Sequence, residues 1–257
     1  MNLILYDDKW IEEAVRRGSS SGGKIRLNWF ERMMVHLLKI AMIISHLFFF
    51  TISHIPGLSS LLETFARTYS RNAIGFFLRG SYYKSKLKMM GKNVIIDVGV
   101  YISKPENVEI DDNSFIDSYV VIRGGNQEQG PTKIGKYVHI ASHCVLDGGG
   151  IKIGDYAAIA AGSNIYSISN YYEDPNRRNI GLLSMSAMAP QEKQYVKIAP
   201  VTIEEYAFIG LNCTILPGVT IGKASVIGAG SVLINTIPPY SIAVGSPAKV
   251  IKSRPMG

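Results

Sequence analysis

Residues 203–233 read IEEYAFIGLNCTILPGVTIGKASVIGAGSVL, and a large aliphatic residue returns at every sixth position of this stretch. These positions are held by Ile203, Ile209, Ile215, Ile221, Ile227 and Leu233. The residue four places after each of the first five aliphatics is small: Ala207, Cys213, Val219, Ser225 and Ser231. An amphipathic helix repeats at about 3.6 residues and a half-buried strand at about 2, so neither accounts for six. The period predicts a solenoid in which each six-residue unit is one short strand and one turn.

The same spacing recurs upstream. The aliphatic positions there are Ile110, Ile116 and Ile122, then Ile134, Ile140 and Leu146, then Ile153, Ile159 and Ile165. The small positions are Ser114, Val120, Val138, Cys144, Ala157 and Ser163. Stacked turns would bury one continuous column of aliphatic side chains, which no single turn could bury alone.

The repeat is interrupted in three places. The step from Ile122 to Ile134 is twelve, which keeps the phase, and the step from Leu146 to Ile153 is seven, with residues 148–150 (GGG) absorbing the extra residue. The largest break is residues 166–200. Its aromatic and Met-containing composition favours an excursion that packs on a neighbour or covers a substrate, with a disordered surface insertion as the alternative.

The pattern resembles the hexapeptide-repeat acyltransferase family, whose fold is a left-handed parallel β-helix. The resemblance covers about residues 94–254 and is strongest at 209–252, IGLNCTILPGVTIGKASVIGAGSVLINTIPPYSIAVGSPAKVIK. This end is similar to sugar O- and N-acetyltransferases acting on galactosides, antibiotics and surface-polysaccharide precursors. The resemblance implies acetyl-CoA as acyl donor, a saccharide acceptor and a homotrimer with active sites between subunits.

A catalytic base is expected from histidine, because acyl transfer to a hydroxyl or amine requires proton removal near neutral pH. The chain holds five histidines, and His139 and His143 are the two within the repeats. Galactoside and maltose acetyltransferases carry their histidine at the start of the long loop, where this sequence reads YSISNYY. His139 is therefore the leading candidate base and His143 the second, and the alternative is that both are solvated surface side chains. Asp147 or Asp117 could orient the imidazole.

Other site residues follow from the resemblance. It implies CoA contacts at Gly210, Gly228 and Ala229, with phosphate contacts from Lys249, Lys252 and Arg254, although an ordinary solvated basic tail is equally compatible. Asp147, Asn170 and Tyr171 are candidates for acceptor binding.

Zinc is not expected. Gamma-class carbonic anhydrases share the resembling fold and use three histidines, whereas this repeat region holds two, four residues apart. A catalytic zinc ion needs three protein ligands and one open position. The two cysteines, Cys144 and Cys213, form no CxxC pair and suit a reducing compartment.

The basic excess is confined to the first 92 residues. They hold 14 Lys/Arg against 6 Asp/Glu, a balance of +8, whereas residues 93–257 balance at −1. Residues 33–55, MMVHLLKIAMIISHLFFFTISHI, are apolar but contain Lys39 and three histidines. The readings are a monotopic helix or hairpin on the cytoplasmic leaflet, a spanning helix, and a helical subdomain packed on the solenoid. No nucleic-acid-binding module is recognisable.

These observations predict two domains: residues 1–92, helical and membrane-associated, and residues 93–257, the β-helix with the inserted loop 166–200 and the tail 237–257. The expected function is acetyl transfer to a sugar hydroxyl, or an amine, of a surface glycan or lipid-linked saccharide at the cytoplasmic face of the membrane. The alternatives are a catalytically silent membrane scaffold and an acetyltransferase acting on a small molecule such as an antibiotic.

Overall fold

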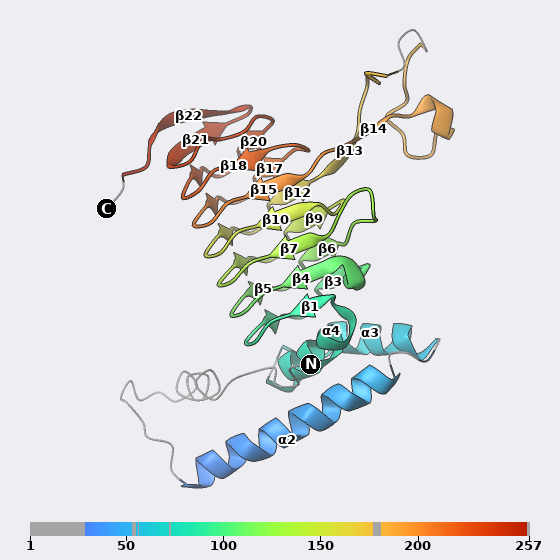
Figure 1. Cartoon of the computed structure of the whole chain (residues 1–257), viewed down its shortest axis with the longest axis vertical. Helices are drawn as coiled ribbons and strands as arrows, with labels where there is room; N and C mark the ends of the chain where they lie inside the picture. Colours follow the sequence, from blue (N-terminus) through green and yellow to red (C-terminus); the bar gives the residue numbers. More distant parts are fainter. Residues whose placement is uncertain (1–28, 53–54, 56, 72, 177–180, 256–257) are drawn as a thin grey trace.

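A computed structural model describes residues 29–52, 55, 57–71, 73–176 and 181–255. The sequence features before residue 29, together with His54, lie outside these residues. The described chain forms three helices followed by a solenoid of short parallel strands (Figure 1).

The solenoid has three sheets, which the chain visits in turn. The first sheet contains β1 (Met89–Met90), β4 (Val108–Ile110), β7 (Thr132–Ile134), β10 (Ile151–Ile153), β15 (Val201–Ile203) and β18 (Thr220–Ile221). The second contains β2 (Ile95–Ile96), β5 (Phe115–Ile116), β8 (His139–Ile140), β11 (Ala158–Ile159), β16 (Phe208–Ile209), β19 (Val226–Ile227), β21 (Ser241–Gly245) and β22 (Ala248–Ser253). The third contains β3 (Tyr101–Ser103), β6 (Val121–Arg123), β9 (Val145–Asp147), β12 (Asn164–Tyr166), β17 (Thr214–Ile215) and β20 (Val232–Leu233). The pairs are parallel except β21 with β22, and the arrangement fits a left-handed β-helix.

The six-residue repeat is confirmed as the origin of the core. All fifteen predicted aliphatic positions are buried, none more than 2% exposed, and the register stacks them, for example Ile140 under Ile159 under Ile209. The eleven small residues four places later are each at most 1% exposed. They lie at the corners, where a larger side chain would have no room between the sheets.

Two breaks in the repeat correspond to a glycine bulge and to an excursion of the chain. Residues 148–150 all have positive φ, which glycine adopts without strain, and they carry the extra residue of the seven-residue step. From the third sheet the chain leaves as an excursion that contains β13 (Ile168–Asn170), a 3₁₀ turn (Gln191–Lys193) and β14 (Val196–Ile198), with β13 and β14 antiparallel. The excursion projects from the side of the solenoid (Figure 1).

Three helices lie at the first turn of the solenoid: α2 (Trp29–Ile52), α3 (Leu58–Thr68) and α4 (Ala73–Lys86). Helix α4 packs against β1, β2 and the 3₁₀ turn Pro105–Asn107, and α2 and α3 pack on α4. Among the described residues, no helix combines the length and hydrophobicity needed to cross a membrane.

Candidate active site

His139 lies on the outer face of the second sheet, in a column of side chains aligned by the parallel register. Phe115 pairs with His139, and His139 pairs with Ala158, which in turn pairs with Phe208. The imidazole stacks on the Phe115 ring, with centroids 5.2 Å apart and planes at 7°. Above it, Ala158 contributes only a methyl group, and the His139 side chain remains 48% exposed. The imidazole is therefore fixed on one side and open to a ligand on the other.

A carboxylate lies beside this imidazole. His139 Nε2 is 3.9 Å from Asp117 Oδ2, and Asp117 Oδ1 accepts a hydrogen bond from the Ser118 backbone N–H at 2.7 Å. This distance is too long for a hydrogen bond, but the carboxylate stabilises the imidazole when the ring becomes protonated. Of the two carboxylates considered from the sequence, the structure places Asp117 here.

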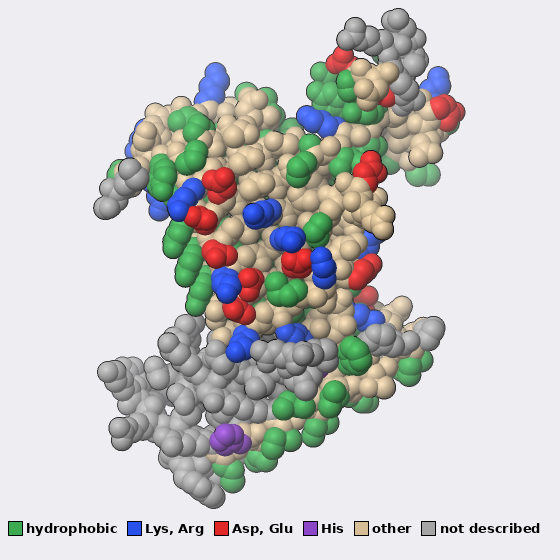
Figure 2. Space-filling model, in the orientation of Figure 1, with side chains coloured by type: hydrophobic (Ala, Val, Ile, Leu, Met, Phe, Trp, Pro, Cys, Tyr) green, Lys and Arg blue, Asp and Glu red, His purple; other side chains and the backbone are tan. Residues whose placement is uncertain are grey.

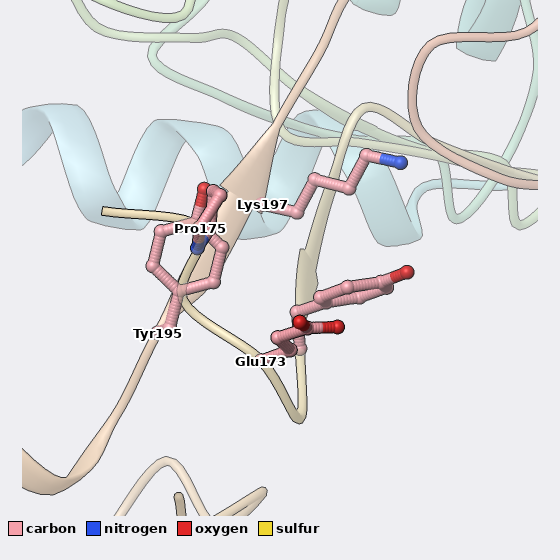
Figure 3. Close-up of a pocket in the computed structure, with 5 residues that line it drawn as sticks. Glu173, Pro175, Tyr195 and Lys197 are labelled. Carbon is pink, nitrogen blue, oxygen red and sulfur yellow. The ribbon is translucent and has the colours of Figure 1, made fainter. Parts of the chain in front are cut away.

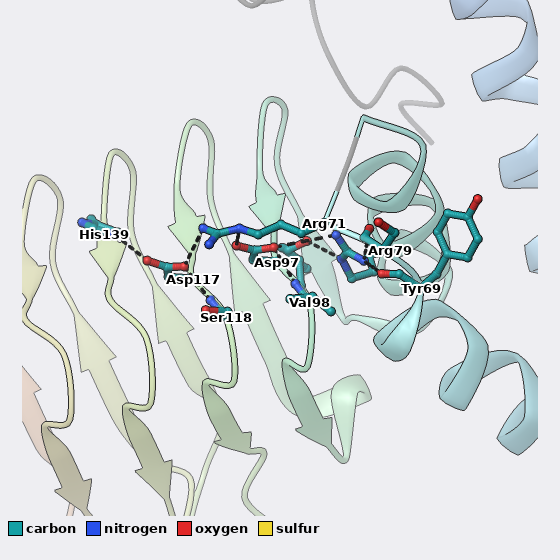
Figure 4. Close-up of polar contacts among 10 residues, drawn as sticks. Tyr69, Arg71, Arg79, Asp97, Val98, Asp117, Ser118 and His139 are labelled. Carbon is teal, nitrogen blue, oxygen red and sulfur yellow. Dashed lines mark hydrogen bonds and ion pairs between the residues drawn. The ribbon is translucent and has the colours of Figure 1, made fainter.

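Asp117 also belongs to a chain of charges that reaches the helices (Figure 4). Arg71 bridges Asp117 and Asp97, with its Nη2 3.3 Å from Asp117 Oδ1 and its Nε 2.7 Å from Asp97 Oδ2. Asp97 is fully buried and lies 3.8 Å from the buried guanidinium of Arg79 on α4. The orientation of the carboxylate beside His139 thus depends on contacts with the segment between α3 and α4.

His143 occupies a different position, the corner between the second and third sheets. Its φ of 60° lies in the left-handed region, as do those of Tyr137, Tyr156 and Tyr206 at other corners. The ring stacks on Tyr119, with centroids 5.3 Å apart and planes at 4°. Among the described residues, the imidazole within 4 Å of a carboxylate is that of His139, not that of His143.

The residues expected to bind CoA lie on the same sheet as His139. Gly210 directly follows β16, and Gly228 and Ala229 follow β19. A Cβ at Gly210 would lie 2.6 Å from the Ala229 backbone nitrogen, so the close stacking of these turns requires glycine there. Lys249 and Lys252 are exposed on β22, the last strand of that sheet. At about 4.8 Å per strand, the five steps from β8 to β22 span about 24 Å of continuous surface.

Two of the candidates for acceptor binding, Asn170 and Tyr171, lie on the excursion and not on the second sheet. Tyr171 follows β13 and, with Glu173, Pro175, Tyr195 and Lys197, lines an open pocket of about 260 Å³ (Figure 3). Lys197 Nζ lies 5.4 Å from the centre of the Tyr171 ring. Asn170 is engaged within the excursion, since its Nδ2 donates to the Met185 carbonyl at 2.7 Å. Aromatic rings beside a carboxylate and an ammonium group can hold the face and hydroxyls of a sugar.

Asp147 lies on neither surface. It ends β9 on the third sheet, where its Oδ2 is 3.2 Å from Arg123 Nη1. The structure therefore separates Asp147 from His139 and from the Tyr171 pocket.

Several residues of the candidate site were not predicted from the sequence. The column Phe115–His139–Ala158–Phe208 could have been found, because each member directly precedes an aliphatic of the repeat. No such periodic signal marks Arg71, Glu173 or Lys197, whose positions depend on segments outside the repeat.

No group of three or more His, Cys, Asp or Glu residues suited to a metal ion occurs in the described part of the chain.

Comparison with known proteins agrees with this architecture. The model for the hexapeptide repeat of succinyl-transferase matches residues 200–234. A dTDP-4-amino-4,6-dideoxy-D-glucose acyltransferase from Escherichia coli is 31% identical over 168 residues, covering 65% of this chain and 82% of the relative. Two putative acetyltransferases from Staphylococcus aureus are 40% identical over 124 residues, 47% of this chain and 54% of each relative. This chain therefore matches only about half the length of the staphylococcal proteins.

Solved structures show the same likeness. AntD, an N-acyltransferase from Bacillus cereus in complex with dTDP and 3-hydroxybutyryl-CoA, superposes with a TM-score of 0.61 at 26% identity, covering 74% of this chain and 90% of AntD. A variant of AntD in complex with dTDP-4-amino-4,6-dideoxyglucose and coenzyme A also has a TM-score of 0.61, at 28% identity, covering 69% of this chain and 90% of that one. The fold and the relatives define an acyltransferase. The chain belongs to the hexapeptide-repeat acyltransferase family.

Proposed function

We propose that this protein transfers an acetyl group from acetyl-CoA to a hydroxyl or amino group of a saccharide, with His139 as general base. The observation that carries the proposal is the placement of His139. It is the exposed imidazole with a carboxylate at 3.9 Å, on the sheet that also carries Gly210, Gly228 and the lysines of β22. The CoA complexes of AntD support the choice of donor.

In the proposed reaction the base acts on the acceptor. The neutral imidazole of His139 removes a proton from the acceptor hydroxyl or amine as the acceptor oxygen or nitrogen attacks the thioester carbonyl. The C–S bond then breaks, the acetyl group stays on the acceptor, and the imidazolium returns its proton to the CoA sulfur. Asp117 stabilises the protonated form of the imidazole. Backbone N–H groups near the thioester would stabilise the oxyanion.

The donor would extend along the second sheet. Its reactive end would lie near His139, with the pantetheine chain over the glycine-bearing turns at Gly210 and Gly228. The phosphates would meet Lys249 and Lys252, whose ammonium groups are exposed on β22. The span of about 24 Å suits an extended donor.

The acceptor site would be completed by another copy of the chain. His139 faces outward from the second sheet, whereas the Tyr171 pocket lies on the excursion that leaves after the third. These elements lie on different faces of the same chain, so one molecule does not bring them together. A homotrimer, in which the excursion of one copy covers the second sheet of its neighbour, would unite the base with the acceptor pocket.

The acceptor belongs to surface-glycan biosynthesis in this proposal, as a saccharide carried on a lipid or nucleotide at the cytoplasmic face of the membrane. The Escherichia coli relative is named for an amino sugar carried on dTDP, which supports an activated saccharide and makes an amine acceptor the first to test.

The test is acetyl transfer from acetyl-CoA to matched acceptors, measured as product mass and thiol release. A dTDP-linked 4-amino sugar would be compared with its 4-hydroxy counterpart. Saturable product formation with either one supports the proposal, and their ratio distinguishes amine from hydroxyl. If acetyl-CoA neither binds saturably nor is turned over with any saccharide, the protein is a non-catalytic scaffold and the proposal is wrong.

A further inference from the structure

Helix α2 has its apolar side facing away from the protein. Large side chains are exposed along one face, with Ile44 at 62%, Ile40 and Phe48 at 55%, and Leu37 at 52%. The opposite face, which packs on α4, includes the polar residues Ser45 and His46. A surface helix of a soluble protein normally has the reverse arrangement, with its apolar stripe inward and its polar face in water.

Polar contacts hold this inverted helix in place. The hydroxyl groups of Ser45 on α2 and Ser81 on α4 are 3.2 Å apart. His46 is 1% exposed, and Phe49 beside it is 4% exposed. The inward face is thus packed and specific, so the outward orientation of the apolar face is not the result of a loosely attached helix.

Helix α3 adds to the same end of the molecule. Leu61 is 67% exposed, Phe65 is 49% exposed, and Ile55 between the two helices is 49% exposed. Figure 2 shows apolar side chains along the outer edge of α2, at the end of the molecule farthest from the C-terminal strands. Exposed apolar surface of this extent on one end of a protein indicates an interaction site.

The charges around this surface favour an anionic lipid partner. Residues 29–92, which include α2, α3 and α4, hold 9 Lys/Arg against 2 Asp/Glu, a balance of +7. From Leu37 to Phe65 the sequence contains one carboxylate, Glu63, which lies 3.8 Å from Arg67. A net positive segment that carries an exposed apolar face is the combination that binds anionic membrane surfaces.

We infer that the exposed faces of α2 and α3 insert into the headgroup region of an anionic lipid leaflet, with the helices lying along the membrane and the solenoid standing away from it. Ile44 and Leu61 are the anchoring side chains because they are the most exposed aliphatics of the two helices. An anionic membrane is thus the partner of this end of the protein, which deepens the proposed function. The inference rests on that function only for the claim that a saccharide acceptor is present at the membrane.

The experiment is co-sedimentation of the full-length protein with vesicles of phosphatidylcholine and phosphatidylglycerol at a ratio of 7:3, and with pure phosphatidylcholine. The test variant is Ile44→Asp/Leu61→Asp. The control is Tyr137→Asp/Ile234→Asp, which places the same two charges at side chains that are 51% and 50% exposed on the solenoid. Circular dichroism melts establish that each variant folds, and transfer to a soluble acceptor is measured separately.

Wild type and Tyr137→Asp/Ile234→Asp should bind the anionic vesicles equally. The double variant should bind about a hundredfold more weakly, since each buried aliphatic side chain contributes about tenfold. A change of less than threefold, or no binding by wild type, would overturn the inference. The inference would also be overturned if wild type forms an oligomer that does not bind vesicles and the double variant is a monomer. A second copy of the chain would then cover the apolar face. Equal binding to phosphatidylcholine would overturn the preference for anionic lipid. If wild type binds vesicles but transfers no acetyl group to the soluble acceptor, the result counts against the proposed function and not against the membrane inference.

Discussion

Replacing Asp97 by asparagine removes the negative charge that faces two arginines at the junction between helices and solenoid. Asp97 and Arg79 are both fully buried, with Asp97 Oδ1 3.8 Å from Arg79 Nη2. Arg79 also donates to the Ile96 carbonyl at 3.0 Å and to the Tyr69 carbonyl at 2.6 Å, which joins α4 to β2 and to the end of α3. Asparagine keeps the shape and the acceptor for the Val98 N–H but leaves the Arg79 charge without its buried counter-charge.

Breaking a buried ion pair from one side costs about 3–5 kcal/mol, because the remaining charge stays desolvated. Arg79 retains its three carbonyl acceptors in the variant, those of Ile96, Tyr69 and Ser70, so we expect the lower end, about 3 kcal/mol. For a domain of this size that corresponds to a fall in melting temperature of roughly 6–12 °C.

The assay is urea and thermal unfolding of wild type, Asp97→Asn and a surface control, Glu205→Ala. Glu205 pairs with Lys223 where both side chains are more than 40% exposed, and such pairs contribute about 0–1 kcal/mol. A loss in Asp97→Asn of under 1 kcal/mol, or one equal to that of the control, would refute the view that a buried charge pair fastens the helices to the solenoid.

Three further outcomes are expected. Burial raises the pKa of the Cys144 thiol to about 11, so at pH 8 about one molecule in a thousand is thiolate; Ellman's reagent should label Cys144 and Cys213 only after unfolding, and rapid native labelling would contradict their corner positions. Burial lowers the pKa of His46 below its ordinary 6.5, so the unfolded chain binds more protons and stability falls as the pH drops below about 6.5; melting temperatures at pH 7 and 5 should differ less in His46→Gln than in wild type, and an equal difference would contradict this. Asp117→Asn should lower kcat about tenfold or more and alter the acid limb of the pH–rate profile; a lower kcat with an unchanged profile would assign Asp117 a structural role only.

The core was predictable because it depends on a local period. Each six-residue unit of the solenoid buries one aliphatic and one small residue, so residues such as Ile140 and Cys144 are specified by spacing alone. The glycine run 148–150 was likewise predictable, since an extra residue in a stacked turn needs positive φ.

The site was predictable only in part. The repeat places His139 on an outer face, but the carboxylate beside it is identified by distance and not by spacing. Arg71 reaches Asp117 across 46 residues, through a contact between a helical connection and the solenoid that carries no period. The orientation of α2 is similar: its hydrophobicity is plain in the sequence, but the packing of Ser45 and His46 against α4 decides which face is exposed.

The most direct test of the account compares kcat/KM for acetyl transfer in wild type, His139→Ala and His143→Ala, with each protein shown to be folded. General-base catalysis contributes about 10²–10⁴-fold. We predict a loss of at least a hundredfold for His139→Ala, with acetyl-CoA binding retained, and a loss of under tenfold for His143→Ala. If His139→Ala retains activity within tenfold of wild type, His139 is not the base, and a loss confined to His143→Ala would transfer that role to the corner histidine.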